Sequence, residues 1–203
     1  MNLKTNPELL PLIEWWEKDG KQLVLWLAIA LVAFGGWKYW KHHTEAVKTA
    51  ASDALVAAYT TEELETAVAN FGDKKAGGAL KIRLAKSYFD AGRYEEACAQ
   101  YEQLEGQPIE GYADVPVVGK AHCLEALGKF DEALAAFDAF AGAEANTNNY
   151  LKLTAQLGAA RCFAQKGDKA AALARIAALK KANKDNELAK SRVEAAEDVI
   201  KRF

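Results

Sequence analysis

The sequence has little proline and no excess of charge of either sign. Only 4 of its 203 residues are proline, whereas alanine is abundant, and this composition favours an almost entirely helical domain. The 26 lysines and arginines nearly balance the 28 aspartates and glutamates, so the chain lacks the broad basic surface typical of nucleic-acid-binding proteins. With 51% hydrophobic and 27% charged residues, it suits one soluble domain with a small appendage. We therefore expect no nucleic-acid partner.

Motifs that carry catalysis or bind a cofactor are also lacking. His42 and His43 are adjacent, but neighbouring residues on a helix point about 100° apart, and no cysteine or carboxylate completes a metal site with them. Gly77-Gly78 has neither the preceding strand nor the following lysine-serine pair of a phosphate-binding loop. The third histidine, His122, lies inside a predicted repeat, and no catalytic arrangement of serine or cysteine with histidine is recognisable. We expect no enzyme, no cofactor and no metal.

The three cysteines, Cys98, Cys123 and Cys162, are widely spaced and show no metal-ligand spacing. Each lies inside a predicted helix, where a cysteine usually serves as a small buried side chain. In an oxidising compartment, two of the three cysteines could form one disulfide. Cys98 and Cys123 lie on sequential predicted helices and are the pair that we expect to be near each other.

One stretch lacks charge altogether. The run from Gln22 to Trp37 has a lysine on each side and is followed by two further aromatic residues. Lysines that snorkel and an aromatic belt at the end of an apolar run predict one membrane-spanning helix over residues 22–40, with residues 1–21 as a leader. A cleaved signal peptide is an alternative, although bulky aromatic residues stand where small residues would be needed. Lysines are balanced on the two sides of the run, so charge alone does not set its orientation.

Three segments after the run share one pattern of residues. In the first, from Leu80 to Leu104, apolar residues recur at three- and four-residue spacing on both sides of Gly92, which predicts two helices joined by a glycine turn. The same pattern surrounds Gly128 and Gly167. The aligned residues are Ala85, Tyr88, Gly92, Tyr94, Ala97, Tyr101 and Leu104, then Ala121, Leu124, Gly128, Phe130, Ala133, Phe137 and Phe140, then Ala160, Phe163, Gly167, Ala172, Ile176 and Leu179. Such repetition indicates stacked helical hairpins.

The predicted fold class is therefore all-α, with an N-terminal transmembrane helix followed by an α-solenoid over residues 41–203. Small alanines such as Ala97 and Ala133 are expected where the two helices of a hairpin meet. A solenoid needs caps at both ends. The expected elements are a degenerate hairpin at about 45–72, hairpins at about 77–104, 115–141 and 150–182, and a capping helix at 186–203 with Leu188, Val193, Ala196 and Ile200 facing inward.

The repeated hairpin resembles the tetratricopeptide repeat, which has small residues in both helices, a glycine turn and an aromatic residue after it. The resemblance implies a concave surface lined by the first helices, with the fifth, ninth and twelfth residues of each repeat pointing into it. The fifth positions in this chain are Ile82, Val118 and Leu157, the ninth are Lys86, His122 and Arg161, and the twelfth in the first two repeats are Phe89 and Glu125. An apolar column beside a basic one would suit a peptide with apolar anchors and acidic groups or a C-terminal carboxylate. Reversing the charges of Lys86 and Arg161 is expected to weaken binding and leave melting nearly unchanged, because exposed charges contribute little to stability.

A second resemblance covers nearly the whole chain. The sequence WWEKDGK, the uncharged run, the segment GWKYWKHH from Gly36 to His43 and the degenerate repeats resemble the YfgM family. That resemblance implies a single-pass protein of the bacterial inner membrane, with its N-terminus in the cytoplasm and its repeats in the periplasm. It also implies an ancillary translocon subunit, with SecYEG and a PpiD-like membrane-anchored chaperone as protein partners. The alternatives are an envelope-assembly adaptor or soluble peptide receptor not associated with the translocon, and association of the repeats with a second copy.

Overall fold

The computed structural model describes residues 15–73, 77–144 and 149–203, and every regular element among them is helical, as the sequence predicts. The chain divides into two compact units, residues 1–50 and 51–203, and each is described here by itself. Most of the expected leader, residues 1–14, lies outside the described residues.

The first unit consists of a π-helical turn, η2 (Trp16–Gly20), followed by the long helix α2 (Lys21–Ala57), which continues into the second unit. α2 is long and apolar enough to cross a membrane. Its large apolar side chains between Leu23 and Trp40 are exposed, consecutive residues included, whereas the core helix of a soluble domain buries an apolar stripe. The helix also runs without interruption past Glu45, so the first helix of the degenerate hairpin expected at about 45–72 is continuous with it. The span over residues 22–40 stays a prediction.

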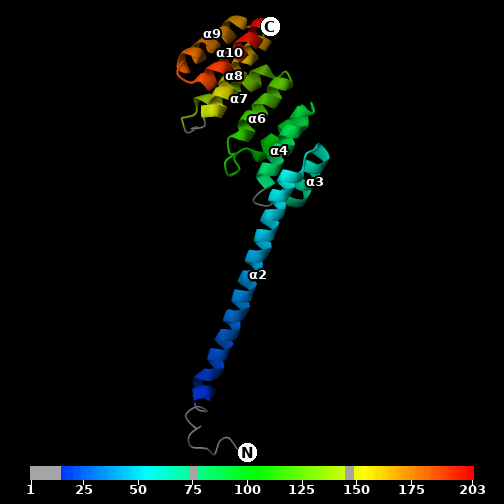
Figure 1. Cartoon of the computed structure of the whole chain (residues 1–203), viewed down its shortest axis with the longest axis vertical. Coiled ribbons are helices and arrows are strands. Elements are labelled where there is room, and N and C mark those ends of the chain that lie inside the picture. The colour runs from blue at the N-terminus through cyan, green and yellow to red at the C-terminus, as the bar shows by residue number, and fades with distance from the viewer. Residues whose placement is uncertain (1–14, 74–76, 145–148) are drawn as a thin grey trace, which may run out of the picture. The chain divides into compact units, whose positions relative to one another are not determined.

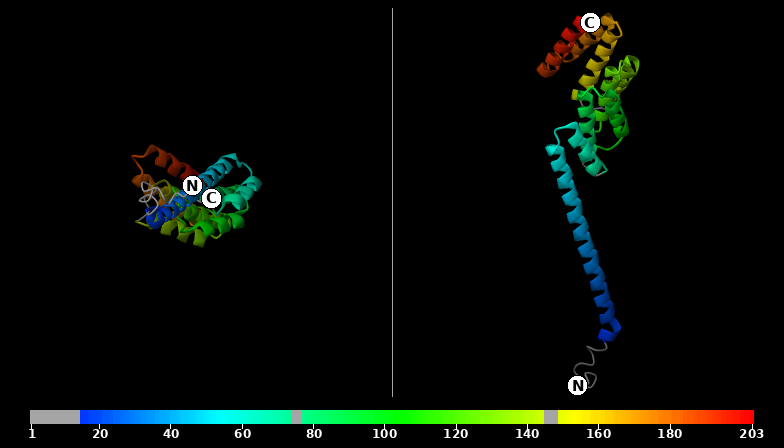
Figure 2. Two further views of the ribbon diagram at one scale, coloured as in Figure 1. Left: turned by 90° about the horizontal axis from the view of Figure 1, so that it is seen from below. Right: turned by 90° about the vertical axis from the view of Figure 1, so that its right-hand side faces the viewer.

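The second unit continues from the last turns of α2 through a series of shorter helices. In chain order these are α3 (Thr61–Phe71), α4 (Gly77–Asp90), α5 (Tyr94–Leu104), α6 (Val115–Ala126), α7 (Phe130–Gly142), α8 (Asn149–Gln165), α9 (Lys169–Ala182) and α10 (Glu187–Arg202). The pairs α4 and α5, α6 and α7, and α8 and α9 are helical hairpins, which are stacked in chain order (Figures 1 and 2). The helix α3 packs against α4, and α10 packs against α8 and α9.

The first helices of the hairpins lie closer together than the second helices. α4 contacts α6, α6 contacts α8 and α8 contacts α10, whereas over the described ranges α5, α7 and α9 do not contact one another. A stack whose first helices approach one another while its second helices stand apart must curve, with the first helices on the concave side. The concave surface implied by the repeat pattern is therefore built from α4, α6, α8 and α10.

Each hairpin turns through a glycine with a left-handed backbone. Gly92, Gly128 and Gly167 have φ angles of 77°, 75° and 88°, a region that glycine enters without steric cost. The residue after each glycine donates its backbone N–H to the carbonyl five residues earlier, and all three N···O distances are 2.9 Å. The predicted glycine turns are thus confirmed. The third hairpin makes the same turn although Lys169 stands where the other second helices begin with an aromatic residue.

Alanines line the contact between the two helices of every hairpin. The aligned alanines are Ala85 and Ala97, Ala121 and Ala133, and Ala160 and Ala172, none of which is more than 1% exposed. A side chain of one methyl group lets two backbones approach closely. The predicted small positions Ala97 and Ala133 are confirmed as buried.

A glycine beneath an aromatic ring joins each of the first two hairpins to the next one. A Cβ atom at Gly119 would lie 2.6 Å from the ring of Tyr101, and one at Gly158 would lie 2.5 Å from the ring of Phe137. Tyr101 and Phe137 are aligned positions of the second helices, so the contact repeats with the hairpins. Because no carbon atom fits at such distances, both glycines are required by the packing of one hairpin on the next.

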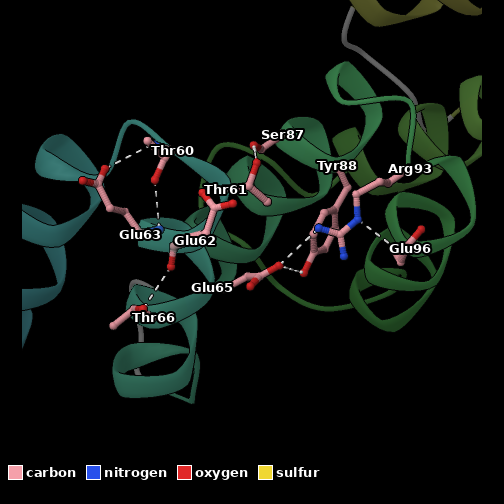
Figure 3. A network of polar contacts seen from close by, with 10 residues as sticks. All are labelled: Thr60, Thr61, Glu62, Glu63, Glu65, Thr66, Ser87, Tyr88, Arg93 and Glu96. Carbon is pink, nitrogen blue, oxygen red and sulfur yellow. Dashed lines mark hydrogen bonds and ion pairs between the residues drawn. The ribbon is translucent and has the colours of Figure 1, made fainter.

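Polar contacts fasten α3 to the first hairpin (Figure 3). Thr60 caps α3, since its hydroxyl accepts the backbone N–H of Glu63 at 3.2 Å while the Glu63 carboxylate accepts the backbone N–H of Thr60 at 3.1 Å. Farther along α3, Glu65 accepts a hydrogen bond from the hydroxyl of Tyr88 at 2.8 Å. Arg93 stacks over the ring of Tyr88, with its guanidinium carbon 4.2 Å from the ring centroid. α3 therefore caps the stack through hydrogen bonds as well as apolar contacts.

The helix α10 closes the other end of the stack. Val193 and Ile200 are fully buried against the last hairpin and Ala196 packs beside them, as predicted. The prediction for Leu188 is wrong, because this side chain is 70% exposed and Ala189 is buried instead. The inward-facing positions 189, 193, 196 and 200 are spaced by four, three and four residues, and Leu188 lies about 100° around the helix from the first of them.

Candidate partner-binding groove

A cavity of about 560 Å³ opens among the first helices of the three hairpins. Its walls are formed by Lys86, Phe89, Tyr101, Gly119, His122, Glu125, Ala126, Arg161 and Gln165. Five of these are predicted partner-binding residues, which α4, α6 and α8 bring together from distant parts of the sequence: Lys86, Phe89, His122, Glu125 and Arg161. We call this space the concave cavity.

A buried carboxylate forms part of the wall of the concave cavity. Glu125 is only 8% exposed and accepts two hydrogen bonds from Arg161, from Nε at 2.8 Å and from Nη2 at 2.7 Å. Nδ1 of His122 lies 3.2 Å from the same carboxylate. Burial acting alone would raise the pKa of Glu125, but the hydrogen bonds from His122 and Arg161 outweigh burial and hold this pKa below its usual value. The carboxylate therefore stays charged and fixed in place.

The imidazole of His122 is held on two sides. Its ring meets the ring of Phe137 edge to face, with the centroids 4.8 Å apart. Nδ1 of His122 lies 3.2 Å from the Glu125 carboxylate and 3.3 Å from Arg161 Nη2, and the tautomer of the imidazole decides which of the two it bonds. Glu125 and Arg161 together therefore fix the orientation of the ring.

The second basic side chain of the cavity also has an internal partner. Nζ of Lys86 lies 2.8 and 2.7 Å from the two carboxylate oxygens of Asp90, one turn later on α4. The Lys86 side chain is 67% exposed, so this pair is open to solvent and contributes little to stability. Neither Lys86 nor Arg161 presents an unpaired positive charge.

The apolar column expected beside the basic one does not face the cavity. Val118 and Leu157 are 3% and 5% exposed and lie in the hydrophobic cores between helices. Ile82 is half-buried and lines a second cavity, of about 320 Å³, that shares Lys86 and Tyr101 with the first. Four residues advance a helix by about 400°, so the fifth position is turned about 40° from the ninth. The fifth positions are turned toward the packing between hairpins, whereas Ala126 and Gln165, turned by the same angle to the other side of the ninth, line the cavity.

The model of a family described as a tetratricopeptide repeat-like domain matches residues 14–145, which is more than half of the chain. The chain belongs to this family. A search of curated proteins and a search of solved structures each gave no match. The matched region contains the apolar part of α2 and the first two tetratricopeptide-like hairpins. The third hairpin lies beyond it, yet makes the same glycine turn.

Four residues of this tetratricopeptide-like cavity were missed by sequence reasoning. Ala126 and Gln165 each stand four residues after a predicted ninth position, and this helical spacing could have identified them. Gly119 lines the wall because it has no side chain, and Tyr101 comes from the second helix of the preceding repeat, so no rule about first helices includes it. Oε1 of Gln165 is buried and has no hydrogen-bond partner in the described part of the chain.

The three cysteines of the tetratricopeptide-like unit lie within its helices. All three cysteines are free, and burial raises the pKa of the Cys123 and Cys162 thiols to about 12, so both stay protonated near neutral pH. Cys98 and Cys123 pack in the same hydrophobic cluster, in agreement with their expected proximity. Within residues 15–73, 77–144 and 149–203, no three histidine, cysteine or acidic side chains gather as metal ligands would.

Proposed function

We propose that this chain is a membrane-anchored scaffold that binds a segment of a partner protein in the concave cavity. The observation that carries the proposal is the cavity itself, since three successive hairpins contribute their first helices to one opening. Tetratricopeptide-like repeats generally mediate contacts between proteins and are typically not catalytic. The family match includes α2 as well as the first two hairpins, which supports the proposal that the apolar helix and the repeats function together.

The partners that we propose are the SecYEG translocon and a PpiD-like periplasmic chaperone. The resemblance of the Gly36 to His43 segment to the YfgM family supports this assignment. In this proposal the chain is an ancillary translocon subunit of the bacterial inner membrane, with its N-terminus in the cytoplasm and its repeats in the periplasm. The cavity would hold a segment of one partner while α2 keeps the scaffold beside the translocon.

Chemical crosslinking in intact membranes, with identification of the adducts by mass spectrometry, tests the proposal. Ala126 is exposed and lines the cavity, so Ala126→Trp fills the space with little effect on the core. Ala135 is also exposed but lies on the second helix α7, so Ala135→Trp is the matched control. We expect translocon and chaperone adducts with the unaltered chain and with Ala135→Trp, and a loss of those that need the cavity with Ala126→Trp.

Other outcomes separate the parts of the proposal. Adducts only with other envelope proteins, lost with Ala126→Trp, would favour the alternative of an adaptor that is not associated with the translocon. Adducts that persist in full with Ala126→Trp would show that the concave cavity is not the binding site.

A further inference from the structure

The inner row of helices continues past the concave cavity onto α10. Arg192 of α10 donates a hydrogen bond from Nη2 to Oγ1 of Thr154 at 2.8 Å and stacks over the ring of Tyr150 at 4.4 Å. Thr154, Arg161 and Gln165 are seven and four residues apart on α8 and so share one face, and the last two line the cavity. The side of α10 that carries Arg192 therefore lies beside the face of α8 that opens into the cavity.

That side of α10 is apolar and exposed. Leu188, Ala195 and Val199 lie four residues before Arg192 and three and seven residues after it, so the four side chains form one stripe. Leu188 is 70% exposed and Val199 is 45% exposed. We call Leu188, Ala195 and Val199 the α10 stripe.

The α10 stripe is not explained by the capping role of the helix. The face of α10 where a further hairpin would stack carries Glu187, Ser191, Glu194 and Asp198, as a solenoid cap requires. Polar residues there keep the end of the stack in water. An exposed apolar stripe on the neighbouring face instead marks a surface for contact.

Gln165 lies where α8 borders both surfaces. α8 and α10 run in the same direction because the antiparallel helix α9 separates them. Thr154 and Arg192 are in contact, so Val199, seven residues farther along α10, lies level with Arg161, one turn before Gln165. Because Gln165 lines the cavity, the Val199 end of the α10 stripe lies beside the cavity wall.

The charge pairs of the cavity decide which segment fits. Arg161 already makes two hydrogen bonds to the Glu125 carboxylate, and Lys86 is paired with Asp90. An acidic ligand would have to displace the Glu125 carboxylate to reach Arg161, and at the exposed Lys86 it would meet the negative charge of Asp90. An uncharged ligand leaves both pairs intact and still gains burial against Phe89 and the other apolar walls.

We propose that the groove extends from the concave cavity onto the α10 stripe and binds an uncharged partner segment with two apolar anchors. One anchor packs against Phe89 and Tyr101, and the other packs on Ala195 and Val199, which are one turn apart at the end of the stripe nearer the cavity. This proposal rests on the proposed function and specifies the chemistry of the segment that the scaffold binds. It replaces the acidic ligand that the repeat pattern suggests.

Fluorescence anisotropy with labelled synthetic peptides and the full chain in detergent tests the extension. The first peptide has a tryptophan near one end, a leucine near the other and serine and glutamine between them; the second has glutamates in place of the central serines; the third has serines in place of both anchors. We expect the first to bind, the second to bind no more tightly and the third not to bind. Val199→Asp should weaken binding of the first about tenfold, and Ser191→Asp, on the outer face of the same helix, should not.

Each result has a distinct meaning. Val199→Asp is expected to melt like the unaltered chain because the side chain is partly exposed, and Ala195→Asp, at an exposed position one turn away, provides a second variant of the same anchor site. Unchanged affinity in both variants would confine the groove to the cavity, while the Ala126→Trp crosslinks would still decide the proposed function. Tighter binding of the glutamate peptide, or no binding of the first peptide, would overturn the uncharged segment.

Discussion

Arg161 owes its place in the cavity to Glu125, a residue on a different hairpin. From its repeat position it is expected to be an exposed base that can be reversed without effect on melting. The structure changes this expectation, because Arg161 holds a carboxylate that is only 8% exposed. A reversed charge at this position would bring two carboxylates together in a partly dry site, so loss of binding would be confounded with loss of fold.

A substitution that removes the charge of Arg161 but keeps most of its aliphatic chain tests the Arg161–Glu125 pair by itself. We expect Arg161→Met to lower the free energy of unfolding by about 1 to 3 kcal/mol near neutral pH, because Glu125 then loses its charged donor while buried. Lys86→Met removes a pair that is open to solvent and should cost less than about 1 kcal/mol. Urea unfolding of the two variants, in the same detergent, measures both values. Equal losses would mean that Glu125 is not held by Arg161 in solution.

The same variants predict a pH dependence. The lowered pKa of Glu125 in the folded chain contributes stability that is present above the usual carboxylate pKa of about 4 and is lost as pH falls through the lowered value. In Arg161→Met burial is less opposed, so the folded pKa rises and the penalty of burying the charge disappears once the group is protonated. The gap between variant and unaltered chain should therefore narrow as pH falls below about 4.

The elements of the hairpins follow from local rules, whereas the contacts between hairpins do not. Gly92, Gly128 and the seam alanines are found in sequence because turn geometry and helix spacing act over a few residues. Gly119 and Gly158 look like ordinary helix-weakening glycines until the rings of the preceding second helices are placed over them. The residues of the candidate site also fall into a predictable and an unpredictable group. Its ninth and twelfth positions are predictable from the repeat, but the burial of Val118 and the pairing of Arg161 depend on helix rotation and on the neighbouring repeat.

Gly158 offers a test of the contact between hairpins. Gly158→Ala would place a methyl group 2.5 Å from the ring of Phe137, and overpacking of this kind costs about 1 to 3 kcal/mol, more than the gain of about 1 kcal/mol from helix propensity. We expect a lower melting temperature. The matched control is Gly142→Ala at the end of α7, where no atom lies within 4 Å of the added carbon and melting should be unchanged or slightly higher. If both variants melt alike, the second and third hairpins do not pack as described.

For the molecule as a whole, the decisive feature is the length of α2. Its 37 residues extend roughly 55 Å at 1.5 Å per residue, whereas the hydrocarbon core of a bilayer is about 30 Å thick. A span over residues 22–40 would use the apolar half of the helix and leave the half that follows Lys41 outside the bilayer. The exposed apolar side chains and the polar, charged remainder of the helix divide at this point. One continuous helix can therefore serve as both anchor and first element of the repeat unit.

The last prediction concerns the side of the membrane on which the repeats lie. Balanced lysines leave the orientation open, and the resemblance to the YfgM family favours a cytoplasmic N-terminus. We expect the full-length chain to stay in the membrane pellet after alkaline carbonate extraction, because residues 22–40 would be buried in lipid. Protease added outside spheroplasts should then digest residues 41–203 and leave the leader protected, and lysis of the spheroplasts should expose the leader as well. Protection of the repeats until lysis would reverse the orientation, and a shortened chain released by carbonate would indicate a cleaved signal peptide in place of an anchor.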